Sequence, residues 1–349
     1  MGEMAEEKTK IAIAGWGNVG RGVYESIKRN PDMDFAGIIT RRPFEVKKEF
    51  PSSSILDMNL FDFASFDYSN PLSHSDELWF WLHGRVDVAV LCGGSKNDLP
   101  VQGPFFARHI NTVDSFDTHA NIPEYFDKMN KVAEKYNHTS IISAGWDPGT
   151  FSLERVLADA FIPGAKNYTF WGPGVSQGHS DAVRKIEGVL DARQYTLPIK
   201  KAIKEVRKGG NPELTTRQKH KRLVYVVTEK SFSRERIAHE ILTMPNYFAN
   251  YDTTVRFISK DEMKKNHTAY PHGGFVLTSG TTGNNHKALI EYRNGWDSNP
   301  EATGNILIAC ARACHRMNKE EKSGAYTMLD IPPAYYSPRT KGELLSKFM

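Results

Sequence analysis

The sequence predicts an α/β protein with two domains, the first a doubly wound parallel sheet and the second an α+β domain with a mostly antiparallel sheet. Three observations support this prediction. The chain has 349 residues, which exceeds the length at which a single core usually divides. Apolar strand-like runs alternate with helical segments over residues 1–147. Beyond them, strand-like runs follow one another with few helices between them.

Composition narrows the functional class. Lys and Arg total 45 against 41 acidic residues and are scattered, which argues against nucleic-acid binding. The start, MGEMAEEKTK, is charged and precedes only a short apolar run, so we expect neither a secretory signal nor contact with a membrane, and a cytoplasmic location. The cysteines Cys92, Cys310 and Cys314 are too few for a disulfide framework. Cys310, Cys314 and His315 predict a buried helix face, and no metal site is expected.

The first motif is a dinucleotide fingerprint. Residues 10–30, KIAIAGWGNVGRGVYESIKRN, place an apolar strand before G-x-G-x-x-G and an amphipathic helix after it. Gly15 permits the tight turn, Gly17 lets a pyrophosphate approach the backbone, and Gly20 lets helix and strand pack closely. This context predicts a Rossmann-type dinucleotide-binding domain. The expected cofactor contacts here are Gly15, Trp16, Gly17, Asn18, Val19 and Gly20.

The next strand indicates which dinucleotide is bound. FAGII, from Phe35, ends in Thr40, Arg41 and Arg42, where an NAD enzyme would present a carboxylate to the ribose hydroxyls. A hydroxyl and two guanidiniums suit a 2′-phosphate, so NADP is favoured over NAD. The alternative is an ordinary solvated basic turn.

Further strands are predicted at residues 86–92, 111–113 and 139–143, each followed by a polar or glycine-rich loop. Ligands of open α/β sheets bind at the carboxyl ends of the strands. No elements are assigned between residues 43 and 85. The expected cofactor contacts in the three loops are Cys92, Gly93, Gly94, Ser95, Ser115, Phe116, Asp117, Pro148 and Gly149.

The second domain is predicted to begin near residue 148, with a helix over 151–161 that Pro163 and Gly164 end. A second helix is expected at 234–244. We assign 1–147 to the nucleotide domain and 148–304 to a substrate-binding and dimerisation domain. The helical segment 305–349 is expected to pack back on the first domain. Strand-like runs in the second domain are NYTFWG, RQYTLP, RLVYVV, TTVRFI, GGFVLTS and KALIEYR.

Ten blocks spread over nearly the whole chain resemble the meso-diaminopimelate dehydrogenase family. In order they are GWGNVGR, TRR, VDSFD, SAGWDPG, FWGPGVSQGHSDA, QYTLP, HKR, TMPNYF, PHGG and HRM. The resemblance implies reversible, NADP-dependent oxidative deamination at the D-centre of meso-2,6-diaminopimelate, giving L-2-amino-6-oxopimelate and ammonia. In the reductive direction this reaction feeds lysine and cell-wall synthesis. It also implies a homodimer formed through the second domain.

The resemblance also assigns the reacting centre. It places Asp117 and Asp147 at the reacting amine, where a carboxylate could accept a proton and stabilise an iminium charge. Which of the two takes the proton is left open, and for Asp147 an Asp-Pro-Gly turn is the alternative. Asp114 is expected to support the loop or form a turn. Trp146 is expected to line the substrate site.

Around the distal L-centre the resemblance places Thr196, Arg222, His272 and Asn299. Arg222 offers a bidentate fork to a carboxylate, Thr196 and His272 add hydrogen-bond donors, and Asn299 can serve the amine. Without the resemblance, Arg222 would be read as a surface residue and His272 as a turn residue.

Residues 170–184, FWGPGVSQGHSDAVR, are interpreted as a glycine-rich loop that shapes the substrate site, and the resemblance implies that it faces the nicotinamide. His179, Ser180 and Asp181 are adjacent, and consecutive residues rarely converge as a triad. For His179 and Ser180, bonding within the loop and catalysis are both left open. The substrate contacts expected here are Trp171, Gln177, Gly178 and Asp181.

Two rival interpretations remain at this stage. Another NADP-dependent dehydrogenase of the aspartate pathway, such as dihydrodipicolinate reductase or homoserine dehydrogenase, would share the two-domain fold. A non-catalytic NADP sensor would keep the first domain, but it has little use for the polar residues of the second.

Overall fold

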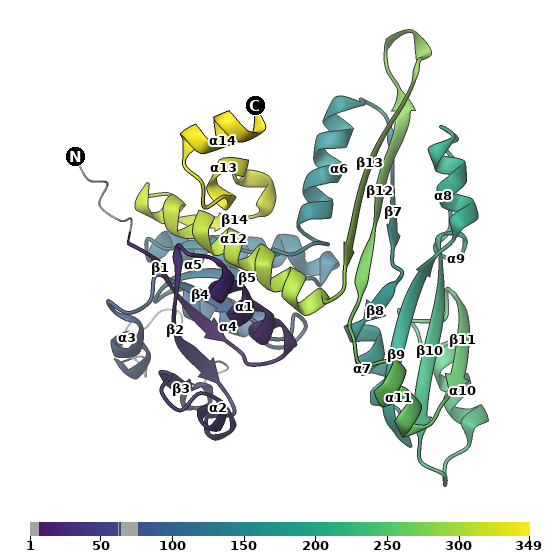
Figure 1. The fold of residues 1–349 in the computed structure, drawn as a ribbon, viewed down its shortest axis with the longest axis horizontal. Helices are drawn as coiled ribbons and strands as arrows, with labels where there is room; N and C mark the ends of the chain where they lie inside the picture. Colours follow the sequence, from purple (N-terminus) through teal and green to yellow (C-terminus); the bar gives the residue numbers. More distant parts are fainter. Residues whose placement is uncertain (1–6, 62, 64–75) are drawn as a thin grey trace. The chain divides into compact units, whose positions relative to one another are not determined.

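The computed structural model describes residues 7–61, 63 and 76–349 (Figure 1). The chain forms two compact units, one of Met1–Leu153 with Pro300–Met349 and one of Glu154–Asn299. The predicted junction at 147/148 lies directly before the helix α6 (Thr150–Phe161), whereas the compact units divide inside it. None of the helices in the described part of the chain is long and apolar enough to cross a membrane.

The first unit is built on a seven-stranded sheet in the order β14-β6-β5-β4-β1-β2-β3. All of its pairings are parallel, so the predicted doubly wound α/β fold is confirmed. The strands are β1 (Thr9–Ala14), β2 (Met33–Thr40), β3 (Ile55–Asp57), β4 (Val88–Leu91), β5 (Asn111–Asp114), β6 (Thr139–Ile141) and β14 (Gly324–Tyr326). The helices are α1 (Asn18–Arg29), α2 (Pro43–Glu49), α3 (Asp76–Leu82), α4 (Leu99–Ala107), α5 (Ile122–Lys135), α12 (Asn299–Lys319), α13 (Pro333–Tyr336) and α14 (Lys341–Phe348).

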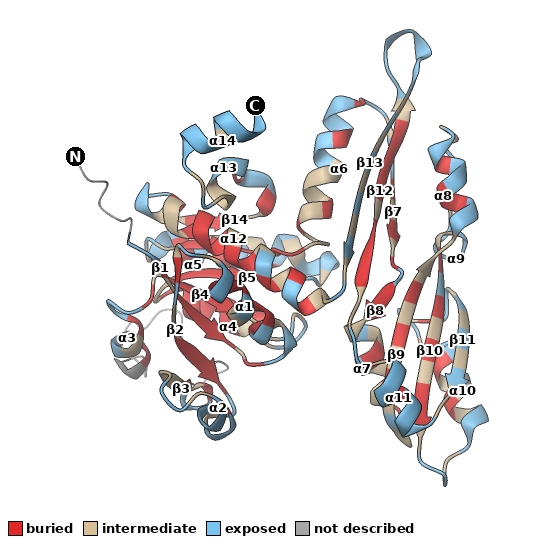
Figure 2. Cartoon of the chain, in the orientation of Figure 1, coloured by how far each residue is buried: buried red, intermediate tan, exposed pale blue. Residues whose placement is uncertain are grey.

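Alternation along β1 divides the core of the first unit between the two faces of the sheet. Figure 2 shows the central strands β1, β4 and β5 as largely buried. Ile11 and Ile13 pack in one cluster with residues of α1 and α12. Ala12 and Ala14 pack in the other, with residues of α3, α4 and α5. Successive side chains of a strand point to opposite faces, so the apolar run of β1 serves two helical layers.

Helix α12 is a structural part of the first unit. Cys310 and Cys314 are fully buried on it, which confirms the helix-face interpretation of these cysteines. Arg312, only 3% exposed, forms an ion pair with Asp32 at the start of β2, with 2.8 Å between Nη2 and Oδ1. Its guanidinium also donates to the Asn30 side chain and to the carbonyl of Tyr336. Burial opposes ionisation of Asp32, yet the Arg312 guanidinium holds the pKa of that carboxyl below its ordinary value.

The second unit contains two sheets, one in the order β11-β10-β9-β8 and one in the order β13-β12-β7. Only the β10–β11 pairing is parallel among the described strands of this unit, so the prediction of a mostly antiparallel α+β domain is confirmed. The strands are β7 (Lys166–Trp171), β8 (Gly174–Ser176), β9 (Val189–Pro198), β10 (His220–Thr228), β11 (Asp252–Phe257), β12 (His272–Thr281) and β13 (Lys287–Trp296). The helices are α7 (Gln177–Arg184), α8 (Lys200–Arg207), α9 (Thr216–Lys219), α10 (Arg234–Thr243) and α11 (Lys260–Asn266).

The interpretation of residues 170–184 as a loop was wrong. Trp171 ends β7, a two-residue turn leads into β8, and Gln177–Arg184 form the helix α7. Ser180 and Val183 are buried on α7, and Val183 packs in a cluster with Ala192 of β9 and with residues of β10 and α10. Packing on the sheet outweighs the weak helix propensity of this glycine- and serine-containing segment.

We expect Arg312→Met to lower the free energy of unfolding by about 1.5–3 kcal/mol, because the partly exposed Asp32 carboxylate loses its charged hydrogen bonds to the guanidinium. Chemical denaturation measures the change, and Lys319→Met, at an exposed position of the same helix, is the control. The folded-state pKa of Asp32 is depressed, so the stabilisation is present above the ordinary value of 3.8 and is lost as the pH falls through the folded-state value. Equal loss in both variants would contradict this role of Arg312.

Candidate functional site

In the first unit, a pocket of about 200 Å³ lies at the carboxyl ends of β1, β2 and β4. The fingerprint turn, the Thr40–Arg42 turn and the Cys92–Gly94 loop line it together. The sequence predicted each of these three segments separately as a cofactor contact. Three further residues line it that sequence reasoning missed: Met58, Asp98 and Gln102. Asp98 lies far along the chain from Arg41, and no local pattern marks it as a neighbour. The full lining is Gly15, Trp16, Gly17, Thr40, Arg41, Arg42, Met58, Cys92, Gly93, Gly94, Asp98 and Gln102.

The glycines of the fingerprint are required by close backbone contacts. Gly15 has φ +103°, and a Cβ on Gly20 would lie 2.2 Å from the carbonyl oxygen of Gly15. Gly17 is the N-cap of α1 and provides no side-chain acceptor for the first-turn N–H groups. Asn18 and Val19 begin that helix. The first turn of α1 therefore offers backbone donors to an anion.

The basic turn after β2 is held by neighbouring groups. Arg41 makes an exposed ion pair with Asp98, with 3.2 Å between Nη1 and Oδ1, and Asp98 also accepts from the N–H of Gly94. Arg42 donates to the carbonyl oxygen of Trp16 at 2.8 Å, and its N–H donates to Thr40 Oγ1. Both guanidiniums thus lie at the pocket. The residues fit a phosphate-bearing ligand, because the only carboxylate among the described lining residues is Asp98, which has a guanidinium beside it.

The loop after β5 is fixed by a buried carboxylate. Asp114 accepts hydrogen bonds from the N–H groups of Phe116 and Ser143 and from the Tyr125 hydroxyl. Burial raises its pKa to about 6, against the effect of these donors. Asp114 therefore supports the loop, as expected. Ser115, half-buried, and Phe116, buried against the Tyr125 ring, lie in this loop.

The two candidate carboxylates follow neighbouring strands of the sheet. Asp117 is exposed, and its N–H donates to Ser95 Oγ at 2.8 Å, which connects the loops after β4 and β5. Asp147 is half-buried in the turn after β6, followed by Pro148. In this turn Gly149 has φ +130°, and a Cβ on it would lie 1.8 Å from the carbonyl oxygen of Gly145. Trp146 packs edge-on against Phe151 at 5.2 Å.

In the second unit, a row of buried polar side chains occupies one face of the β9–β10 pair. His220 and Arg222 alternate along β10, and Gln194 and Thr196 alternate along β9, with Thr196 directly opposite Arg222. Farther along the same face the residues are apolar and are covered by α7 and α10. The alternation and register of β9 and β10 therefore place these four polar side chains together at one end of the face.

Arg222 is a buried cation without a carboxylate partner in the described part of the chain. It is 5% exposed, and its Nη1 donates to Thr196 Oγ1. The Tyr251 ring lies 4.0 Å from its Cζ, a stacking contact that sequence reasoning missed. Burial lowers the pKa of Arg222, and Tyr251 opposes that change. A desolvated guanidinium with an unpaired Nε favours an anionic ligand.

Two further predicted residues come from later elements: His272 begins β12, and Asn299 begins α12. His272 is the first residue of β12 and is buried, and a Cβ on Gly174 would lie 2.5 Å from its Cα. Gly174 pairs with Thr196, so the structure brings His272, Thr196 and Arg222 together. Asn299 follows β13, and its N–H donates to the carbonyl oxygen of Tyr270 at 2.8 Å.

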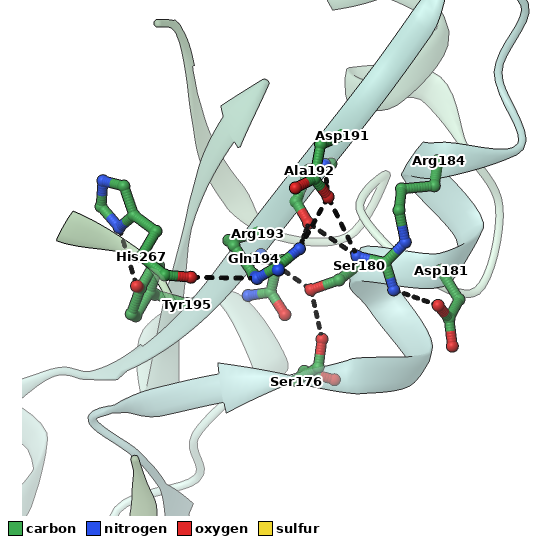
Figure 3. Close-up of polar contacts among 10 residues, drawn as sticks. All are labelled: Ser176, Ser180, Asp181, Arg184, Asp191, Ala192, Arg193, Gln194, Tyr195 and His267. Atoms are coloured by element: carbon green, nitrogen blue, oxygen red, sulfur yellow. Dashed lines mark hydrogen bonds and ion pairs between the residues drawn. The ribbon is translucent and has the colours of Figure 1, made fainter. Parts of the chain in front are cut away.

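Helix α7 is fastened to β9 (Figure 3). Ser180 Oγ donates to the Ser176 carbonyl oxygen at 2.6 Å and accepts from the Gln194 N–H at 2.9 Å. Arg184 donates to the Ala192 carbonyl oxygen and forms an ion pair with Asp181. Gln177 and Gly178 form the first turn of this helix.

His179 also bonds within this junction. Its Nδ1 lies 2.8 Å from Ser176 Oγ, and its ring packs edge-on against Tyr247. Burial and the charge of Arg222 lower the pKa of His179 to about 3. The structure therefore shows internal bonding for both His179 and Ser180.

Comparison with known proteins identifies the chain's relatives. Residues 145–298 match the family model described as the diaminopimelic acid dehydrogenase C-terminal domain. The meso-diaminopimelate D-dehydrogenase of Ureibacillus thermosphaericus is 47% identical, over 98% of this chain and 99% of that protein. The Acetivibrio thermocellus enzyme of the same name is 48% identical, over 99% and 98%.

Solved structures of similar proteins agree with these sequence matches. A Clostridium tetani meso-diaminopimelate dehydrogenase variant with diaminopimelate is 43% identical, covers 98% of this chain and 100% of its own, and has a TM-score of 0.85. The Corynebacterium glutamicum enzyme in complex with diaminopimelate is 39% identical, covers 98% and 99%, and has a TM-score of 0.87. An engineered D-amino acid dehydrogenase bound to NADP+ is 38% identical, covers 98% and 100%, and has a TM-score of 0.81. The chain belongs to the meso-diaminopimelate D-dehydrogenase family.

Proposed function

We propose that this chain catalyses the reversible, NADP-dependent oxidative deamination of the D-centre of meso-2,6-diaminopimelate, giving L-2-amino-6-oxopimelate and ammonia. This reaction serves lysine and diaminopimelate biosynthesis. The observation that carries the proposal is the buried Arg222 guanidinium, which has no ion-pair partner among the described residues and lies in a row of polar side chains. A chain of this family that only sensed NADP would have no use for that desolvated cation.

Sequence spacing supports the assignment of the distal pocket. The six substitutions in the C. tetani variant replace Gln, Thr, Arg, Pro, His and Asn, separated by 19, 26, 49, 1 and 27 residues. In this chain the same residue types recur at the same intervals. Five of the six were predicted from the sequence, and Pro271, whose carbonyl oxygen accepts from the Val175 N–H, was missed. The matching residues are Gln177, Thr196, Arg222, Pro271, His272 and Asn299.

The distal pocket distinguishes the L-centre from the D-centre through hydrogen-bond partners. Arg222 and Thr196 bind the distal carboxylate, His272 adds a donor, and Asn299 serves the amine. A substrate that lacks the second amino-acid head would leave these groups unpaired, which is costly. Trp146, Trp171, Gln177, Gly178 and Asp181 complete the substrate contacts.

At the reacting centre, Asp117 or Asp147 accepts the proton of the substrate ammonium and stabilises the iminium charge that follows. Both carboxylates follow strands of the nucleotide-binding sheet, where the cofactor is expected. NADP supplies the hydride acceptor, and its 2′-phosphate is bound by Thr40, Arg41 and Arg42. The Arg41–Asp98 pair is exposed, so releasing Arg41 to a phosphate costs little.

We infer a homodimer formed through the second unit. Val156, Leu157 and Phe161 of α6 and Leu289 of β13 are exposed apolar side chains of this unit. The ten residues of β13 include none that is buried. Leu157 and Phe161 are one turn apart on α6, and exposed apolar surface at such positions supports a protein contact here. A cytoplasmic location is consistent with the three free cysteines.

One assay tests the reaction. The protein is incubated with NADP and meso-diaminopimelate, and then with the L,L isomer, while NADPH absorbance is followed. We expect turnover with the meso compound alone, because only it carries a D-centre. No increase in NADPH absorbance with either isomer would contradict the proposed function.

Arg222→Met should raise KM for meso-diaminopimelate by roughly 10–100-fold, since about 1.5–3 kcal/mol is lost with a charged hydrogen bond. The Kd of NADPH, measured by fluorescence titration, should stay unchanged. Arg256→Met, at an exposed position of β11, is the matched control. An unchanged KM in the Arg222 variant would remove this residue from the pocket.

Replacing Arg41 and Arg42 together with Ala should weaken NADP about tenfold or more, because two charged donors to the 2′-phosphate are lost. NAD lacks this phosphate, so its Kd should change less. Titration calorimetry with both cofactors measures the difference, and replacing Lys28 and Arg29 together with Ala, in the last turn of α1, controls for net charge. Equal losses for the two cofactors would show that the turn does not bind the 2′-phosphate.

A further inference from the structure

The backbone N–H of Trp171 faces away from its own sheet. β7 is the edge strand of the three-stranded sheet, with β12 as its only neighbour there. The next residue, Gly172, donates its N–H to Gly273 on the β12 side at 2.6 Å. Successive N–H groups of a strand point in opposite directions, so that of Trp171 points away from β12.

His220 accepts this outward N–H. The distance from the Trp171 nitrogen to His220 Nε2 is 2.8 Å. The imidazole also stacks on the indole of Trp171, with ring centroids 5.1 Å apart and planes 22° apart. His220 begins β10, which belongs to the other sheet of the same unit. One side chain therefore holds both the backbone and the ring of Trp171.

The hydrogen bond defines the chemical state of His220. Because Nε2 accepts, the ring proton lies on Nδ1, and the ring is neutral. Nδ1 is buried and has no hydrogen-bond partner among the described residues. Burial, helped by the charges of Arg222 and Lys219, lowers the pKa of His220 to about 3, so the acceptor persists through the neutral range.

The position of His220 connects it with the substrate pocket. It lies two residues from Arg222 on the same buried face of β10. Phe in its place would retain the stacking but leave the Trp171 N–H unsatisfied. The imidazole is thus used as an acceptor, which neither Phe nor a protonated His could provide.

We propose that His220 is a positioning residue for the substrate pocket, which fixes the Trp171 indole by accepting its backbone N–H and stacking on its ring. The proposal rests on the proposed function, in which Trp171 contacts the substrate. A displacement of about 1 Å in a residue that positions substrate can cost as much as a hundredfold in rate.

Two variants of similar size isolate the hydrogen bond. His220→Gln and His220→Met both remove the stacking ring, but only the Gln amide oxygen can accept the Trp171 N–H. We expect His220→Met to raise KM for meso-diaminopimelate roughly tenfold, and His220→Gln to stay within about threefold of the wild type. The Kd of NADPH should be unchanged in both. His286→Met, at an exposed position before β13, is the control substitution.

A second measurement needs no substitution. In the wild-type protein, the Trp171 amide should exchange with deuterium roughly a hundredfold more slowly than an exposed amide, although it lies on an edge strand. Fast exchange of this amide, or equal KM values in the Gln and Met variants, would overturn the proposal. The wild type is assayed first: its inactivity would contradict the proposed reaction, whereas an active wild type with unaffected variants would contradict the role of His220 alone.

Discussion

The first unit depends on the close crossing of α1 and α12. A Cβ on Gly22 would lie 2.2 Å from the Pro300 carbonyl oxygen, and one on Gly304 would lie 2.3 Å from the carbonyl carbon of Gly22, so the two backbones are in direct contact. Arg312 then ties the same helix to Asp32 at the start of β2. Buried residues of α12, such as Leu307 and Ile308, pack in the cluster that covers one face of the sheet. The helix that carries the nucleotide fingerprint is therefore packed against a segment that the chain reaches only after the second unit.

Where the sequence predicted the fold, the signal was regular and local. The fingerprint turn, the apolar strands of the first unit and the alternating strands of the second all appear where periodicity placed them. β3 and β14 are only three residues long, too short for any period to be recognised. α7 escaped notice because its helix depends on contacts with β9, through Ser180 and Arg184, that no local pattern contains.

The residues of the candidate site also fall into those that the sequence predicted and those that only tertiary contacts reveal. Arg222 and Thr196 were named from their sequence blocks, but only the register of β9 and β10 shows that they lie opposite each other. No motif or local pattern in the sequence distinguishes His220 or Tyr251 from other residues of the same type. Their importance comes from contacts across elements, an edge N–H in one case and a buried guanidinium in the other. Asp98 became a neighbour of Arg41 only through the parallel arrangement of β2, β1 and β4.

The two units offer positive charge and hydrogen-bond donors to anionic ligands in different ways. In the first, backbone N–H groups and exposed arginines face the pocket, and the Arg41–Asp98 pair is solvated, so exchanging partners is inexpensive in free energy. In the second, the Arg222 guanidinium is already desolvated and is supported by Thr196 and Tyr251. Neutral His179 and His220 lie near it and do not add positive charge, because burial keeps both unprotonated. A buried cation whose neighbours are neutral gains most from an anion placed in register with it and little from a misplaced one, so discrimination between the two ends of a symmetric substrate is expected of the second unit.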